Sequence, residues 1–462
     1  MKRDSTVKRP DPPVADSPLL RRLFDPVDVA SIALFRAAFG LLMLWHILQY
    51  FAKGWLQSSY LRPVFLFKYP GFEWVERAEA GTLKLIFWAM AVSALLIGVG
   101  LAYRAACAAF CLGHSYMLLL DTAQYQNHLY LISLVAFVMI FIPAHRAFSL
   151  DALLRPKLRS NMVPAWCLWL LRIQLGIPYF YGGLAKINAD WLLRAQPMRL
   201  WLREGTEGGL RLPFQREVWG AYVFSWGGML YDLLIIPALL WRRTRIPALV
   251  LTLLFHLANS ELFSIGVFPW LMLAAVGLYL APDWPRKAGL AGRKPRQASG
   301  GSFGKDWEAA PARQRIVLTL LAAWLAVQFL VPFRHLLYPG NVDWTEEGHR
   351  FSWRMKLRDK RGAVRFVAVD PRSNQAFPLS VQGTVVTSRQ HRMMEHDPEM
   401  MRQLAGHLAG KLREGGLGGV EVRVITSISF NGRRKQPMVD PNADLASIAH
   451  GKGDWIEPLR EP

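Results

Sequence analysis

Long apolar segments recur along most of the chain and alternate with short connections that carry charged residues, prolines and glycines. Several segments approach the ~20 residues that an α-helix needs to cross a bilayer. The pattern therefore predicts a polytopic α-helical membrane protein. We expect about nine transmembrane helices, over residues 29–51, 82–102, 105–120, 127–143, 164–184, 219–240, 246–258, 265–281 and 316–333.

The pattern changes after Tyr338-Pro339-Gly340, where the long apolar runs stop. Residues 365–369 and 420–430 are β-rich, residues 398–414 have a helical period, and Asn431-Gly432 is a turn signal. These signals favour a small α+β domain. The predicted parts are an N-terminal cytoplasmic segment over 1–28, a transmembrane helical domain over 29–337 and an extracytoplasmic α+β domain over 338–462.

Positive charge is unevenly distributed along the chain, which has 55 Lys and Arg, 34 Asp and Glu, and a formal net charge of +21. Most Lys and Arg between the apolar segments lie at the N-terminus and in every second connection, where they orient membrane helices. We therefore do not expect a nucleic-acid partner. The positive-inside rule places the N-terminus in the cytoplasm and, after an odd number of crossings, the α+β domain outside. The first 28 residues lack a signal-peptide pattern, so the first apolar helix is expected to be the membrane signal.

The cysteine and motif content excludes several classes of protein. Cys107, Cys111 and Cys167 all lie in apolar segments, so no disulfide framework is expected. No predicted span carries a His-x-x-x-His or Glu-x-x-His pair, and no metal site is expected. The sequence also lacks a Gly-rich phosphate loop and a Gly-x-Ser-x-Gly motif, which argues against a nucleotide enzyme and a serine hydrolase.

Ionisable residues inside membrane helices are costly, so each one is a functional candidate. The predicted spans and their edges contain Arg36, His46, His114, His128, Arg172, Lys186 and His256. For Arg36 we favour a structural role in tying helices together. For His46 and His114 we expect structural roles with their polar atoms satisfied.

Three polar groups are expected at the outer membrane edge, beneath the α+β domain. Asn127 and His128 open one span, and Lys186 follows the end of another. His256 and Asn259 share a helix face at the end of a third span. This convergence suggests one site. Alternatively, Lys186 could be an interfacial lysine whose ammonium reaches the headgroups, and the two histidines could be helix-end residues.

The chemistry of this cluster suits a hydroxylated ring. Desolvation favours the neutral amine of a lysine at the edge of an apolar cavity, and a neutral amine can act as a general base. Amides and imidazoles beside it can hold the ring and an oxyanion. A lipid-soluble quinol that enters sideways from the bilayer fits such a site.

Six motifs occur in order along the chain. They are Ala33-Leu34-Phe35-Arg36, Asn127-His128-Leu129-Tyr130, residues 180–191, residues 256–268, residues 282–287 and Phe351-Ser352-Trp353-Arg354-Met355. Together they resemble the vitamin K-dependent gamma-glutamyl carboxylase family, and the first fits its shared transmembrane (HTTM) domain. The resemblance covers the nine spans and extends to about Asp440.

The resemblance implies a peptidyl-glutamate 4-carboxylase, a carbon–carbon lyase with coupled vitamin K epoxidase activity. In that family's reaction an enzyme base deprotonates reduced vitamin K, which then reacts with O2. The resulting strong base removes a γ-proton from glutamate, the carbanion captures CO2, and the quinone leaves as its epoxide. The implied cofactor is phylloquinol or menaquinol, and no metal is implied.

By the same resemblance, Lys186 is the catalytic base. Asn127 and His128 match the pair that holds the quinol ring and its oxyanion, while His256 and Asn259 match a second support. Arg203, Arg358 and Lys360 are more loosely aligned candidates for holding the glutamate carboxylate or CO2, with solvated surface charges as the alternative.

Other functions stay open. A family member can retain quinol oxidation and epoxidation without protein carboxylation. A lipid- or quinone-binding membrane protein and a transporter are non-enzymatic alternatives, although the sequence has no inverted repeat.

The sequence also departs from the animal enzymes, which carry a longer lumenal region, a disulfide and a propeptide exosite. Residues 338–462 contain no cysteine, so that disulfide is not expected. The Ala- and Arg-rich composition favours a bacterial inner (plasma) membrane protein with a periplasmic α+β domain. Its expected partners are the lipid bilayer, a quinol and a glutamate-containing protein or peptide.

Overall fold

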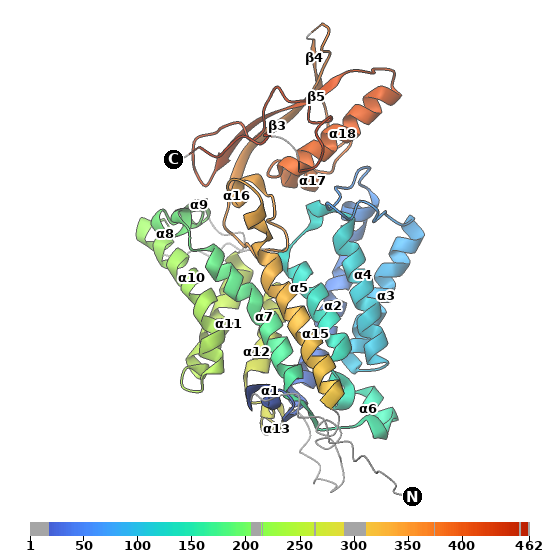
Figure 1. The fold of residues 1–462 in the computed structure, drawn as a ribbon, viewed down its shortest axis with the longest axis vertical. Coiled ribbons are helices and arrows are strands. Elements are labelled where there is room, and N and C mark those ends of the chain that lie inside the picture. Colours follow the sequence, from blue (N-terminus) through green and yellow to red (C-terminus); the bar gives the residue numbers. More distant parts are fainter. Residues whose placement is uncertain are drawn as a thin grey trace, which may run out of the picture.

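The computed structural model describes residues 18–204, 214, 216–262, 265–290, 311–373, 375–451 and 454–460. Residues 1–17 of the predicted N-terminal segment lie outside this description. A bundle of helices forms most of the molecule, and the C-terminal residues form a mixed helix and strand layer over one end of it (Figure 1). We call this layer, residues 338–460, the tail.

Helices occupy all nine predicted positions, with shifted ends. They are α2 (Ala30–Ala52), α3 (Ala80–Val99), α4 (Tyr103–Leu120), α5 (Asn127–Phe141), α7 (Ala165–Ala185), α10 (Val218–Leu240), α11 (Arg245–Leu262), α12 (Phe268–Val276) and α15 (Pro311–Leu330). In the described ranges, four helices are long and apolar enough to cross a membrane: α2, α3, α10 and α15 with its extension to Leu337. The structure therefore supports a helical membrane protein, whereas nine crossings stay a prediction, because helices such as α5 are shorter than a bilayer requires.

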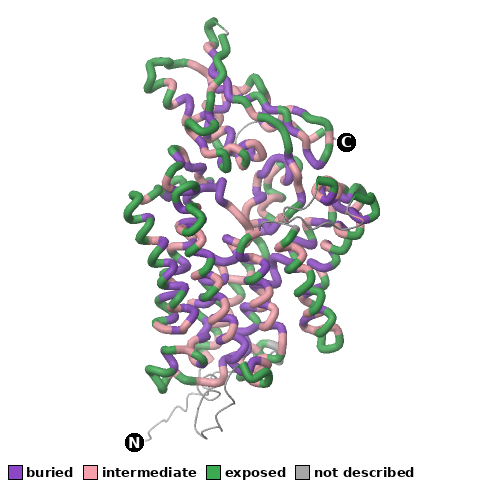
Figure 2. Tube along the Cα trace, turned by 180° about the vertical axis from the view of Figure 1, so that it is seen from behind, coloured by how far each residue is buried: buried purple, intermediate pink, exposed green. Residues whose placement is uncertain are grey.

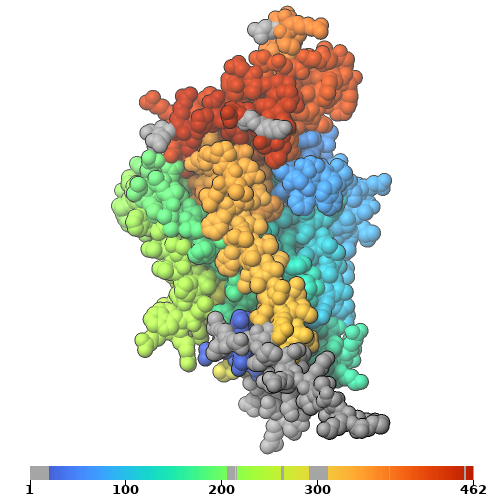
Figure 3. Space-filling view, viewed as in Figure 1, coloured from blue at the N-terminus to red at the C-terminus, as the bar shows by residue number. Residues whose placement is uncertain are grey.

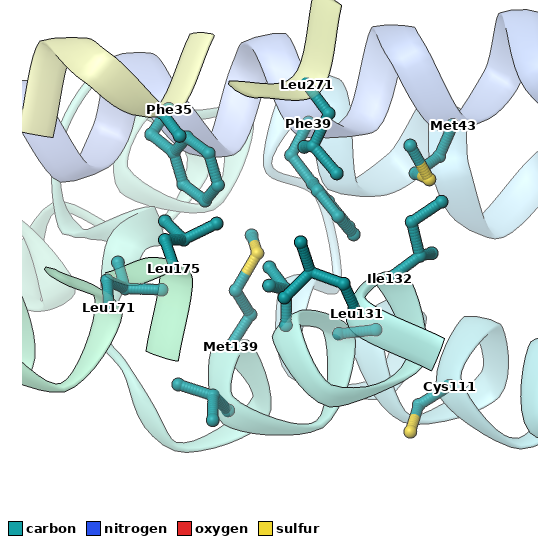
Figure 4. Packing of buried hydrophobic residues seen from close by; sticks show 14 of the residues in the cluster. Phe35, Phe39, Met43, Cys111, Leu131, Ile132, Met139, Leu171, Leu175 and Leu271 are labelled. Atoms are coloured by element: carbon teal, nitrogen blue, oxygen red, sulfur yellow. The ribbon is translucent and has the colours of Figure 1, made fainter. Parts of the chain in front are cut away.

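Apolar side chains from α2, α4, α5, α7 and α12 meet at the centre of the bundle (Figure 4). Phe39 of α2 and Leu131 of α5 are fully buried there, as is Leu175 of α7. Buried positions lie inside the bundle and exposed ones on the outward faces of the helices (Figure 2). On α2 an added Cβ at Gly40 would lie 2.2 Å from the Gly98 nitrogen, so the small residue lets α2 and α3 approach closely.

Arg36 ties helices together, as predicted. Its guanidinium donates to the carbonyl oxygens of Ile97 at 2.6 Å and Gly98 at 2.7 Å, at the end of α3, and to Phe148 O at 2.6 Å. The bond to Gly98 O pairs a carbonyl in the last turn of α3, and the bond to Phe148 O joins α2 to the segment before α6 (Leu150–Leu154).

The expectation of satisfied polar atoms in His46 and His114 is met only in part. His114 Nδ1 lies 2.9 Å from Ser133 Oγ, but the Nε2 atoms of His114 and His46 are buried without a partner among the described residues.

The tail contains a three-stranded antiparallel sheet in the order β4-β3-β5, which confirms the predicted mixture of helix and strand. The elements of the tail are α16 (Val342–Thr345), β3 (Lys360–Val369), β4 (Ala376–Leu379), α17 (Ser388–Met394), α18 (Pro398–Glu414) and β5 (Glu421–Phe430). In the register of β3 and β5, Phe366 pairs with Val424, and both side chains are buried in the core formed with α18.

Side chains from the tail fasten it to the bundle. Gln390 of α17 donates to Phe65 O at 2.8 Å and to Asp121 Oδ2 at 3.1 Å. The amide of Lys68 donates to Gln403 of α18 at 2.8 Å. The tail covers the end of the bundle where α5 begins and α7 ends (Figure 3).

Short elements complete the two ends of the bundle. Near the tail lie α8 (Ala189–Leu193) and α9 (Met198–Glu204), while α1 (Pro18–Arg22), β1 (Pro26–Asp28), α6 (Leu150–Leu154), β2 (Met162–Pro164) and α13 (Trp284–Lys287) lie at the opposite end (Figure 1). There β1 pairs with β2, and Arg286 of α13 forms an ion pair with Asp28 at 3.0 Å.

Candidate functional site

A cavity of about 990 Å³ lies between the helices and the tail. Its walls come mainly from α10, α11 and the tail, with contributions from α5, α7 and α12. Along α11 the lining extends from Asn259, at the tail end, to Ala248 and Thr244 near the other end. At 1.5 Å per helical residue, the stretch from His256 to Ala248 is ~12 Å long. Most side chains on this stretch are apolar, so the cavity has a polar head beneath the tail and an apolar arm between α10 and α11.

The polar head brings together all five residues expected at the outer membrane edge. Asn127, His128, Lys186, His256 and Asn259 all line the same cavity. Asn127 and His128 are the first residues of α5, Lys186 directly follows α7, and the other two lie on α11. Residues more than 100 positions apart in the sequence therefore share one site.

Lys186 forms a buried ion pair at the wall of the cavity. Its Nζ donates to Asp232 Oδ2 at 2.7 Å and to Gly182 O at 3.0 Å. The ammonium also lies 5.4 Å from the centre of the Trp191 ring, whose indole N–H donates to Ser225 O at 2.6 Å. Lys186 is only 7% exposed, whereas an interfacial lysine would extend its ammonium group into the lipid headgroups.

Asp232 is the residue that sequence reasoning missed. It is an acid inside the predicted span 219–240, and the cost of ionisable groups in lipid should have identified it. Desolvation alone favours the neutral amine of Lys186. A carboxylate at 2.7 Å instead stabilises the ammonium.

The opposite side of the polar head carries amides and imidazoles. Asn127 Oδ1 accepts from the Tyr125 hydroxyl at 3.0 Å, which in turn accepts from Phe351 N at 2.7 Å. Within the described residues the amide nitrogen of Asn127 has no partner and is available as a donor. The Tyr125 contacts therefore orient the Asn127 side chain through the tail.

The two histidines lie on either side of Phe268. Its ring centre is 6.0 Å from that of His128 and 5.9 Å from that of His256. His256 Nε2 lies 2.7 Å from the Tyr179 hydroxyl, and its Nδ1 is buried with no partner among the described residues. The three rings form an aromatic wall with polar edges.

Charged side chains of the tail form the wall of the cavity opposite the helices. Arg358 donates to both oxygens of Glu346, at 2.5 Å and 2.7 Å, and it also contacts His349. Lys360 donates to Glu346 at 2.5 Å, to Trp344 O at 2.8 Å and to His396 O at 2.7 Å. Burial by itself raises the pKa of Glu346, but the charges of Arg358 and Lys360 outweigh burial and hold the pKa below its ordinary value.

The alternative for Arg358 and Lys360 was a role as solvated surface charges, whereas both side chains form ion pairs inside the tail. Arg358 lines the cavity, whereas Lys360 is 5% exposed and uses all three N–H groups inside the tail. Lys360 is not among the described residues that line the cavity, and direct binding of a substrate carboxylate by Lys360 stays a prediction. Arg203 is exposed on α9, and it is not among the described residues that line the cavity.

Two further ion pairs in the tail reach the same cavity. Arg354 pairs with Asp343 at 2.6 Å, and Arg350 pairs with Asp397 at 2.6 Å. Each of these arginines has its own carboxylate, while Arg358 and Lys360 share Glu346. With Lys356, which also lines the cavity, these groups of the tail comprise five cations and three anions, so positive charge is in excess. Within the described ranges, no three His, Cys, Asp or Glu side chains are grouped to hold a metal ion.

Two domain families match the chain in succession. Residues 24–284 match the HTTM domain, and residues 313–462 match the lumenal domain of vitamin K-dependent gamma-carboxylase. No solved structure matches the chain. Because the HTTM match alone spans more than half of the sequence and the lumenal-domain match follows it in order, the chain belongs to the vitamin K-dependent gamma-carboxylase family.

Proposed function

We propose that the protein is a vitamin K-dependent gamma-glutamyl carboxylase. It couples epoxidation of a quinol, phylloquinol or menaquinol, by O2 to γ-carboxylation of a glutamate side chain in a protein or peptide by CO2. The observation that supports this proposal most strongly is the single cavity that joins the Lys186–Asp232 pair, the amide and imidazole groups and an apolar arm.

The shape and chemistry of the cavity suit a reduced vitamin K. The apolar arm between α10 and α11 holds the isoprenoid chain, since its walls include Leu234 and Leu251. The ring then lies in the polar head, where Asn127 and His128 hold one hydroxyl oxygen. His256 and Asn259 support the ring from α11.

Lys186 and Asp232 together act as the base. Transfer of one proton from Lys186 Nζ to Asp232 Oδ2, over 2.7 Å, leaves a neutral amine beside a neutral carboxylic acid. This form carries no charge in an apolar site, where isolated charges are costly. The neutral amine then accepts the proton of the quinol hydroxyl, and the hydrogen bond to Gly182 O keeps Nζ in place. When bound, the deprotonated quinol supplies the reactivity with O2 that drives removal of the γ-proton.

The tail binds the glutamate side chain. Arg358 faces the cavity and is held in place by Glu346, while Lys360 fixes Glu346 from behind. The excess positive charge of this wall attracts the substrate carboxylate. Lys360 is therefore a positioning residue, and Arg203 remains a candidate for contacts outside the cavity.

One assay tests the proposal. Purified protein is supplied with reduced vitamin K, a glutamate-containing peptide and labelled bicarbonate, and epoxide and fixed label are measured separately. We expect both products, and loss of both in Lys186→Ala. Epoxide without label identifies a quinol-epoxidising protein that does not carboxylate, and neither product favours a binding protein.

A further inference from the structure

A second pocket, of about 360 Å³, lies outside the cavity described above. It is formed by the α8–α9 segment, the beginning of α10 and the turn after β5, and its described lining residues are distinct from those of the cavity. Three arginines line it: Arg194, Arg199 and Arg433. We call it the arginine pocket.

Positive charge is in excess in the arginine pocket. The carboxylate of Asp190 accepts two bonds of 2.8 Å from Arg433 and one of 2.8 Å from Arg194. Asn431 donates to the same carboxylate at 2.9 Å. One acid is thus shared by two arginines, and Arg199 has no acidic partner among the described residues.

Two buried N–H groups in the arginine pocket lack partners. In the described part of the chain, the Nε atoms of Arg199 and Arg433 are buried without a hydrogen bond. A buried donor without an acceptor is costly, and an arginine donor is best matched by a carboxylate or phosphate oxygen. The surplus charge points to an anionic ligand. Gln196 Oε1, in the same lining, is also buried without a partner among the described residues, so a ligand oxygen reaches the two Nε donors only if these side chains shift.

The surroundings place the arginine pocket at the membrane surface. The Tyr222 hydroxyl donates to Leu193 O at 2.5 Å, and the Trp226 indole donates to Leu192 O at 3.1 Å. Both aromatic residues belong to the first turns of α10, a candidate membrane span, at its tail end (Figure 1). Tyr and Trp are typical of the level of the lipid headgroups. Leu193, in the wall of the pocket, is 70% exposed and suits contact with an acyl chain.

We infer that the arginine pocket binds the phosphate of an anionic phospholipid headgroup. The arginines supply the charge-assisted hydrogen bonds, and the exposed Leu193 and Trp226 cover the first part of the acyl chains. Because α8 begins three residues after Lys186 and Arg433 belongs to the tail, the bound headgroup also joins the tail to the bundle beside the Lys186–Asp232 pair. The binding site itself does not depend on the proposed reaction.

Native mass spectrometry of the detergent-purified full chain tests this inference. The protein is titrated with phosphatidylglycerol, which is anionic, and with phosphatidylcholine, which is zwitterionic. We expect the wild type to bind phosphatidylglycerol in preference to phosphatidylcholine. Arg199→Gln should bind phosphatidylglycerol about fivefold more weakly, because it removes one basic residue near an anionic surface. Arg199→Lys should retain most of the preference. The matched control is Arg62→Gln, which removes an exposed arginine near the tail end of α2 and should bind as the wild type does.

Other results would overturn the inference. Equal preference for phosphatidylglycerol in wild type and Arg199→Gln would exclude the arginine pocket as its site. Inorganic phosphate is the second probe: if it binds the wild type but not Arg199→Gln, while both lipids bind equally, the ligand is free phosphate. If Arg199→Gln fails to fold, Arg194→Gln replaces it, since the Arg194 side chain is 43% exposed, and the same criterion applies.

Discussion

At the scale of single residues, the proposed mechanism depends on Lys186 as the base. Arginine separates a base from a cation that only pairs with Asp232. The Lys186→Arg variant keeps the positive charge. Because an arginine side chain stays protonated in proteins, it cannot accept a quinol proton. We expect this variant to fold and insert while losing both epoxide formation and label fixation in the assay above. Near wild-type turnover by Lys186→Arg would show that Lys186 is not the base.

The ion pair also makes a prediction about stability. Removing one member of a buried pair leaves an uncompensated charge, which typically costs about 3–5 kcal/mol. Asp232→Asn should therefore destabilise the protein, and adding Lys186→Met to it should restore part of the loss. Unfolding in detergent measures both variants. A double variant that is less stable than Asp232→Asn alone would contradict the pairing.

Asn127 gives a test of the quinol site that is independent of the base. Asn127→Ala removes a polar group that the proposal assigns to the quinol ring and leaves its partner unpaired. The expected loss of quinol affinity is about 1–3 kcal/mol, measured by titration of the folded protein. Asn442→Ala, which changes an exposed asparagine of the tail, serves as the control. Unchanged affinity in Asn127→Ala would place the ring elsewhere.

At the scale of elements, the junction of α17 and α18 carries a histidine that responds to pH. Burial lowers the pKa of His396 to about 4, and the charge of Lys360 adds to this effect. In the unfolded chain a histidine has a pKa of about 6.5. Between these two values the unfolded state binds more protons, so stability falls as the pH falls. The loss approaches about 3 kcal/mol near pH 4 and is absent above about pH 7.

His396→Asn should accordingly flatten the pH dependence of stability between about pH 6.5 and 4. Thermal unfolding of the two proteins across this range is the measurement. His450→Asn is the control, because the His450 side chain is 46% exposed and pairs with Glu399 at the surface. If His396→Asn has the same pH profile as the wild type, another group is responsible.

At the scale of the whole molecule, the two ends of the chain are expected on opposite sides of the membrane. The distribution of Lys and Arg and the odd number of predicted spans place the N-terminus inside and the tail outside. A reporter that is active only outside the cytoplasm should function when fused after Arg460, and one that requires the cytoplasm should not. The opposite result would put the polar head of the cavity on the cytoplasmic face and the predicted topology would be wrong.

Sequence reasoning was most successful where the signal is local. Apolar runs predicted nine helical segments, and the change of pattern after Gly340 predicted a tail with both helix and strand. Positions near helix ends also followed from the chain, which is why Asn127, Lys186 and His256 could be assigned to one face. The number of crossings could not be settled in this way, because an apolar run does not reveal how far its helix extends across a bilayer.

The sequence by itself determined which elements form, which polar residues they carry and at which end of the bundle those residues lie. The tertiary structure alone decided which side chains meet. Asp232 faces Lys186 from 46 positions away, Glu346 is shared by Arg358 and Lys360, and Arg433 reaches Asp190 across 243 positions. These contacts depend on how each helix is rotated and tilted against its neighbours, and packing across the whole bundle sets that rotation, whereas local sequence periodicity does not.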